Sequence, residues 1–160
     1  MLTSEGLREI HARTHKNLAD LLTHCHSLDG QEVDQEIPEF NGASVRLQLH
    51  HIIGAEMYWI GVLEGRIDAD EDAHLYPTIE TLEAYRSEVH SGTQNYLQTA
   101  SAEVLSTPRL MTTYGGAEHL LIPGHIVMRT ITHAYHHMGQ VASMLRLLDH
   151  PSPGFDYSIR

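Results

Sequence analysis

The chain has 160 residues, of which 41% are hydrophobic and 19% charged, and its formal net charge is -11. This balance is typical of a globular protein, and 160 residues are enough to bury a core without disulfides or a structural metal. We therefore expect one domain spanning residues 1–160. Only ten residues are Lys or Arg, so the chain lacks the positive charge on which binding to nucleic acid or to an anionic membrane depends.

The first ten residues, MLTSEGLREI, do not have the basic and apolar regions of a signal peptide. No stretch approaches the roughly 20 apolar residues that span a bilayer. The single cysteine, Cys25, cannot form an internal disulfide, and we expect it to be a small core residue. Together these features predict a cytoplasmic protein.

Apolar residues recur at helical spacing in four long segments, which predicts four long helices. The segments cover about residues 4–27, 45–64, 78–100 and 125–148. We expect Gly30 to stop the first helix, and we expect Ser44 to cap the second before Gly65 ends it. The second helix is apolar on nearly every side, so it is expected to be buried on most sides.

The segments between these helices are unequal in length. Residues 32–42 form an acidic loop that contains a proline, and residues 66–77 form a link of about a dozen residues. Residues 101–124 read as a long irregular loop that could hold a short hairpin. Four long helices predict an all-α four-helix bundle, in which facing helices commonly build metal and cofactor sites. Either of the two longer connections is compatible with a crossover topology.

Three histidines on two of these helices indicate a metal site. His133 and His137 are four residues apart, so both lie on one face of the last helix, about one turn apart. His51 would be the third ligand, from the facing second helix. Three protein ligands leave a coordination position for water or substrate, which is the pattern of catalytic sites rather than of structural zinc sites.

Other histidines offer alternatives, because the chain contains 14 of them. His11 and His15 form a second pair with a spacing of four residues. His11 falls within the apolar stripe of the first helix and is a candidate to touch the pocket, although a packed or solvent-facing side chain is the commoner outcome. His50 and His136 are turned away from the three proposed ligands, and we expect neither to bind the metal.

The neighbours of the proposed site predict its surroundings. Gly54 and Ala55, one turn beyond the histidine of the second helix, would leave space beside the metal or allow close helix packing. Tyr58 could bond a metal ligand or be a core tyrosine satisfied by backbone, and Gln140 could orient a ligand histidine. Glu56 is turned away from the site, so we read it as a buried hydrogen-bond acceptor.

Two segments resemble the signature segments of the DinB-like superfamily. They are H-I-x-x-A-E-x-x-W from His51 to Trp59, and H-x-x-H-H-x-G-Q from His133 to Gln140. The resemblance covers most of the chain, because the number and spacing of the helices also match. The commoner form of the second segment has arginine where this chain has Met138, which removes a positive charge near the site.

The resemblance implies a four-helix bundle, often dimeric, with a divalent metal held by one residue of helix two and two of helix four. Carried over, these ligands are His51, His133 and His137. The superfamily includes YfiT-like metalloenzymes, transferases that use bacillithiol and a mycothiol-dependent maleylpyruvate isomerase. By resemblance, we therefore expect a homodimeric enzyme that transfers a low-molecular-weight thiol to a small electrophile.

Two alternatives remain open, a metal-dependent hydrolase and a non-catalytic metal- or ligand-binding stress-response protein. No G-x-S-x-G or H-E-x-x-H element favours a known hydrolase mechanism. The sequence does not distinguish zinc, nickel, iron, manganese or copper, because imidazole ligands suit several transition metals and metal availability usually decides.

Overall fold

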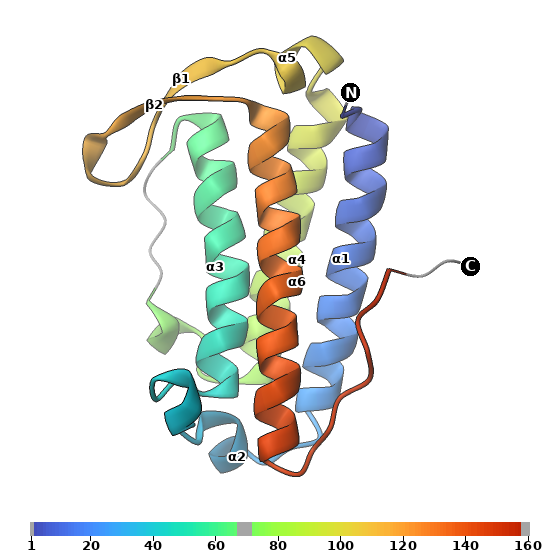
Figure 1. Ribbon diagram of the computed structural model, residues 1–160, viewed down its shortest axis with the longest axis vertical. Helices are drawn as coiled ribbons and strands as arrows, with labels where there is room; N and C mark the ends of the chain where they lie inside the picture. Colours follow the sequence, from blue (N-terminus) through green and yellow to red (C-terminus); the bar gives the residue numbers. More distant parts are fainter. Residues whose placement is uncertain (1, 67–71, 158–160) are drawn as a thin grey trace.

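The computed structural model describes residues 2–66 and 72–157. Four long helices lie side by side along the length of the molecule (Figure 1). They are α1 (Ser4–Cys25), α3 (Val45–Glu64), α4 (Ile79–Thr99) and α6 (Pro123–Leu147). Helix α3 packs against α4 and α6, and α1 packs against the same two helices from the other side. The four predicted segments are thus confirmed to within about two residues at each end.

Local hydrogen bonds fix the ends of these helices. The hydroxyl of Ser44 accepts from the backbone N–H of Leu47 at 3.3 Å, and Gly65 ends α3 with a φ of 75°. Both predicted signals of this helix are confirmed. Gly30 does not simply stop the first helix, because α1 ends at Cys25 and Gly30 is the first residue of the short helix α2 (Gly30–Asp34). The side chain of Asp29 caps α2 and so starts a new helix there.

The segments that were expected to be loops contain further short elements. The acidic loop holds most of α2 and the turn η1 (Pro38–Phe40), and the link after α3 holds η2 (Ala73–Leu75). Residues 67–71 of that link lie outside the described residues. In Figure 1, α3 and α4 run in the same direction, so the connection between them returns the chain to the other end of the molecule.

The segment before the last helix is more regular than expected. It contains α5 (Ala102–Ser106) and a hairpin of β1 (Arg109–Thr112) and β2 (Glu118–Leu121), joined through η3 (Tyr114–Gly116). The strands are antiparallel, with Arg109 opposite Leu121. The short hairpin is therefore confirmed, and the chain is mostly helical with a small two-stranded sheet. Gly115 and Gly116, with φ values of 71° and 79°, form the tight turn.

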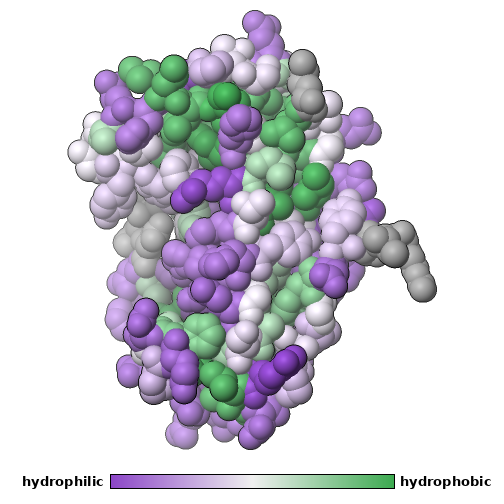
Figure 2. Space-filling view, viewed as in Figure 1, coloured by the Kyte–Doolittle hydropathy of each residue, from purple (hydrophilic) through white to green (hydrophobic). Residues whose placement is uncertain are grey.

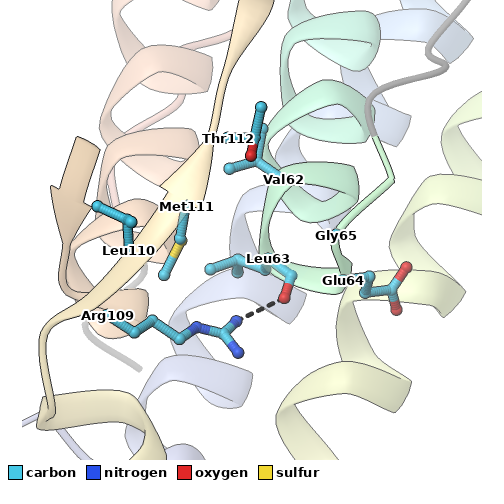
Figure 3. A pocket seen from close by; sticks show the side chains of 8 residues that line it. All are labelled: Val62, Leu63, Glu64, Gly65, Arg109, Leu110, Met111 and Thr112. Atoms are coloured by element: carbon cyan, nitrogen blue, oxygen red, sulfur yellow. Dashed lines mark hydrogen bonds between the residues drawn. The ribbon is translucent and has the colours of Figure 1, made fainter. Parts of the chain in front are cut away.

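The hairpin crosses the end of α3, where the guanidinium of Arg109 donates to the backbone carbonyl of Leu63 (Figure 3). A cavity of about 400 Å³ lies between β1 and this end of the helix. Because α3 rises about 1.5 Å per residue, Leu63 is about 18 Å along the helix from His51. This cavity is therefore remote from the proposed metal ligands.

Apolar side chains fill the space between the four long helices. Leu49, Leu82 and Met138, from three of those helices, are all fully buried, as is Cys25 of the fourth. The cysteine is therefore a core residue, as expected. On the surface, hydrophobic side chains gather over the hairpin end of the molecule, and hydrophilic ones lie over the middle of α3 and α6 (Figure 2). Among the described residues, none of the helices has the length and apolar character needed to cross a membrane.

Candidate metal centre

Helices α3 and α6, which pack against each other, bring together the three histidines proposed as ligands. One ligand atom of each of His51, His133 and His137 lies within 4.8 Å of those of the other two. The ring centroids are between 4.2 and 5.0 Å apart, and the ring planes are inclined by 55° to 81°. The three imidazoles could therefore hold one ion between the two helices.

The site is accessible, and two of its imidazoles favour the uncharged form. His51 is exposed, and His133 and His137 are partly buried. Burial, reinforced by the neighbouring His137 and His51, lowers the pKa of His133 to about 4. Burial also lowers the pKa of His137, although a hydrogen bond with Gln140 opposes this effect. Neutral imidazole is the form that binds metals, so the two histidines of α6 are ready to act as ligands at neutral pH.

Two glutamines contact His137. Oε1 of Gln140 lies 2.6 Å from Nδ1 of His137 and 2.6 Å from Nε2 of Gln48, and Gln48 Nε2 lies 2.5 Å from the same Nδ1. The two contacts of Nδ1 belong to opposite tautomers of His137: Nδ1–H donates to the oxygen of Gln140, whereas an unprotonated Nδ1 accepts from the NH₂ group of Gln48. In either tautomer the NH₂ group of Gln48 donates to the oxygen of Gln140.

A histidine that donates through Nδ1 keeps the lone pair of its Nε2 for a metal. Gln140 thus contacts a candidate ligand, and its role in orienting that ligand stays a prediction. Gln48 was not predicted from the sequence as a contact of a candidate ligand. Its position three residues before His51 places both side chains on one face of α3, and this spacing is a signal that could have found it.

A cavity of about 490 Å³ lies beside His51 and His137. The two glutamines line it, and its other wall comes from Glu39, Phe40 and Asn41, in and just after η1. Gly54 and Ala55 were expected either to leave this space or to allow close helix packing; neither lines the cavity, and Gly54 is buried. The free space comes instead from the way η1 packs beside the helices.

Four other residues named from the sequence are not part of the histidine triad, although the ring of His136 lies 4.9 Å from that of His137. The hydroxyl of Tyr58 accepts from the backbone N–H of Tyr114 at 2.8 Å, so it holds the hairpin turn against α3. This matches the alternative of a tyrosine satisfied by backbone. Met138, at the position of the family's arginine, is fully buried in the core. His50 is also buried, against the rings of Tyr76 and Tyr85, whereas His136 is exposed.

His11 belongs to a second group of histidines, between α1 and α4. One ligand atom of each of His11, His15 and His90 lies within 4.8 Å of those of the others, so this group too has the spacing of a metal site. The carboxylate of Glu56 lies among them, with one oxygen 2.7 Å from Nε2 of His11 and the other 2.9 Å from Nε2 of His15. Thr93 donates its hydroxyl to the same carboxylate at 2.6 Å.

The outer partners of His11 and His15 determine which nitrogen of each ring carries the proton. Arg86, which can only donate, bonds Nδ1 of His15 at 3.3 Å. Gln94 accepts from Arg8 through its oxygen, so its Nε2 donates to Nδ1 of His11 at 2.9 Å. Both Nδ1 atoms are therefore acceptors, and each Nε2–H donates to the carboxylate.

With both Nε2 atoms protonated, the lone pairs of His11 and His15 lie on Nδ1, where they already accept from Gln94 and Arg86. Burial alone would raise the pKa of Glu56, but the attraction of His15 and the hydrogen bonds from both histidines hold it well below its usual range. Glu56 is thus a buried anion held by three donors, which confirms its reading as a structural acceptor. Both histidine groups in the described residues have the spacing of a metal site, but only in the group between α1 and α4 do two Nε2 atoms contact a buried carboxylate.

Comparisons with known proteins agree with this architecture. The family model described as the DinB family matches residues 1–160, and the chain therefore belongs to the DinB family. Among solved structures, it is similar to a DinB-like protein from Bacillus cereus, with a TM-score of 0.76 and 18% sequence identity. That match covers 96% of this chain and 97% of the other, and it shows a shared fold. No curated protein matches the chain.

Proposed function

We propose that the chain binds one divalent metal ion through His51, His133 and His137 and uses it to transfer a low-molecular-weight thiol to a small electrophile. The observation that carries this proposal is the convergence of three imidazoles, from two packed helices, beside an accessible cavity of about 490 Å³. Three protein ligands leave room for an external ligand, which is the pattern of catalytic metal sites. Membership of the DinB family supports the same reading.

The residues present fit such an ion. The partly buried histidines of α6 favour their neutral form, and Gln48 and Gln140 both contact His137 at Nδ1, so these contacts do not involve its Nε2. When bound, the ion would lower the pKa of a thiol and so supply a thiolate at neutral pH. The cavity gives a small substrate access to His51 and His137, while the glutamines keep the His137 ring in a fixed orientation.

The test is turnover by the metal-loaded protein with a set of small thiols and an electrophile such as a chloronitrobenzene. We expect thiol-dependent conjugation that His133→Ala abolishes and that His136→Ala leaves unchanged. Hydrolysis without thiol would favour the hydrolase alternative, and absence of both reactions would favour a binding protein. Elemental analysis of the purified protein would identify the metal among zinc, nickel, iron, manganese and copper.

The family also guides two structural proposals. We propose that α1, α3, α4 and α6 form the four-helix bundle of DinB-like proteins and that the chain forms a homodimer. Light scattering on the purified protein tests the second point, because a monomeric mass at micromolar concentration would contradict it. The cytoplasmic location stays a prediction from the sequence.

A further inference from the structure

The cavity beside the histidine triad has an unusual distribution of charge. Among the described residues that line it, the one charged side chain is Glu39, and the other polar groups are the amides of Asn41, Gln48 and Gln140 and the imidazoles themselves. No Lys or Arg is among the described residues that line it. Glu39 is exposed at the wall opposite the two long helices.

Three backbone N–H groups of this wall are already used in its own turns. The N–H groups of Phe40 and Gly42 both donate to the carbonyl of Ile37, and that of Asn41 donates to Pro38. Pro38 has no N–H of its own. Among the described residues that line the cavity, an anionic group would therefore meet a carboxylate and no cationic Lys or Arg side chain.

The two amides nearest the histidines are already committed to each other. The NH₂ group of Gln48 and the oxygen of Gln140 contact each other, and both also contact Nδ1 of His137. The carboxylate of Glu39 has only acceptor atoms, so it favours a ligand that brings donors. A protonated amine is such a group, and it also complements the negative charge.

We propose that this cavity selects ligands by charge, and that the carboxylate of Glu39 shifts the affinity of the site toward a small ligand with an ammonium group and away from one with a carboxylate or phosphate. The proposal depends on the proposed function in one respect, which is that an external ligand must be able to bind the metal. It narrows the substrate class to small amine-bearing molecules, with aminothiols as the simplest examples. Glu39 acts as a specificity residue through its charge.

The test measures thiol binding to the cobalt-substituted protein by the sulfur-to-cobalt charge-transfer band. The probes are 2-aminoethanethiol, 2-mercaptoethanol and 3-mercaptopropionate, which differ in charge but little in size. Their thiols also differ in acidity, so the quantity to compare is the ratio of each Kd between Glu39→Gln and the unsubstituted protein. This ratio cancels the intrinsic acidity of each thiol.

We expect Glu39→Gln to weaken the aminothiol and to strengthen the carboxylate thiol, changing their relative affinity by about three- to tenfold at low ionic strength. The change should shrink at 1 M salt, where the Debye length is only about 3 Å. The matched control is Glu118→Gln, which removes an exposed carboxylate from the hairpin and should leave the ratio unchanged. An unchanged ratio in Glu39→Gln, or an equal change in both variants, would overturn the proposal.

A second set of probes separates this proposal from the thiol chemistry. N-alkyl imidazoles ending in an ammonium or a carboxylate bind cobalt without a thiol and are followed by the d–d bands. If no thiol binds, the thiol-transfer function fails, and the imidazoles alone decide the charge selection. If all thiols bind with a ratio that Glu39→Gln does not change, the thiol function stands and charge selection fails.

Discussion

Arg86 donates a hydrogen bond to Nδ1 of His15 across 3.3 Å, and this contact separates two histidine groups that look alike in their spacing. A guanidinium has no acceptor, so His15 must accept at Nδ1 and carry its proton on Nε2, where it meets Glu56. At His137 the contacts of Gln48 and Gln140 are both made to Nδ1, and no carboxylate is among these partners. The hydrogen-bond partners, rather than the distance between the rings, distinguish the two groups.

The orientation of His137 by Gln140 predicts a loss of metal affinity when the glutamine is removed. Partners of metal-bound histidines typically contribute about 10- to 100-fold to affinity, so Gln140→Ala should raise the Kd for zinc by about that factor. Competition with a chromogenic chelator measures the change. Gln94→Ala is the matched control, because Gln94 contacts His11 in the other histidine group and should leave the zinc affinity unchanged. Equal losses in both variants would contradict the assigned roles.

The buried carboxylate of Glu56 is expected to stabilise the fold without affecting the metal. Removing it in Glu56→Ala leaves three buried donors without their acceptor, which should lower the free energy of unfolding by about 3–5 kcal/mol. Urea denaturation of the metal-free protein measures this loss. The exposed Glu118→Ala should change the free energy of unfolding by less than about 0.5 kcal/mol. A urea midpoint for Glu56→Ala close to that of the unsubstituted protein would show that the network contributes little.

Buried histidines should make the metal-free protein less stable in acid. Burial, with the charges of His15 and His11, lowers the pKa of His90 to about 4, and burial also lowers the pKa of His15. An unfolded histidine has a pKa of about 6.5, so between these values the unfolded chain binds more protons than the folded one. Stability is therefore fully present above pH 6.5 and falls as the pH drops toward 4.

His90→Leu tests the origin of this pH dependence. Nδ1 of His90 is buried without a hydrogen-bond partner in the described structure, so its loss should cost little stability at pH 7. The difference between the urea midpoints at pH 7 and pH 5 should become smaller in the variant. A difference as large as in the unsubstituted protein would mean that other groups cause the acid sensitivity.

Removal of the metal should leave the helices in place. Four long helices enclose a core of apolar side chains, and residues such as Leu49, Leu82 and Met144 are fully buried without any contribution from the site. The chelated protein should therefore keep its helical circular dichroism spectrum. Its melting temperature should fall only by the increase that metal binding adds through mass action. Loss of helicity on chelation would make the ion structural.

Much of this architecture could be predicted because its signals are local. Ser44 and Gly65 mark the ends of α3, and the four-residue spacing of His133 and His137 places them on one face of α6. The cavity could not be predicted, because it depends on how η1 packs beside α3 and α6. Spacing alone also could not separate the two histidine pairs, since the proton positions depend on partners such as Arg86, 71 residues along the chain from His15.

The most direct test of the central claim is the number of metal ions bound by each folded chain, measured by equilibrium dialysis against zinc followed by elemental analysis. The unsubstituted protein is expected to bind one ion, His133→Ala to bind none, and both His15→Gln and His136→Ala to bind one. Circular dichroism on the same samples would show that each variant is folded. Two ions in the unsubstituted protein, or loss of the ion in His15→Gln with retention in His133→Ala, would contradict the assignment of the site to α3 and α6.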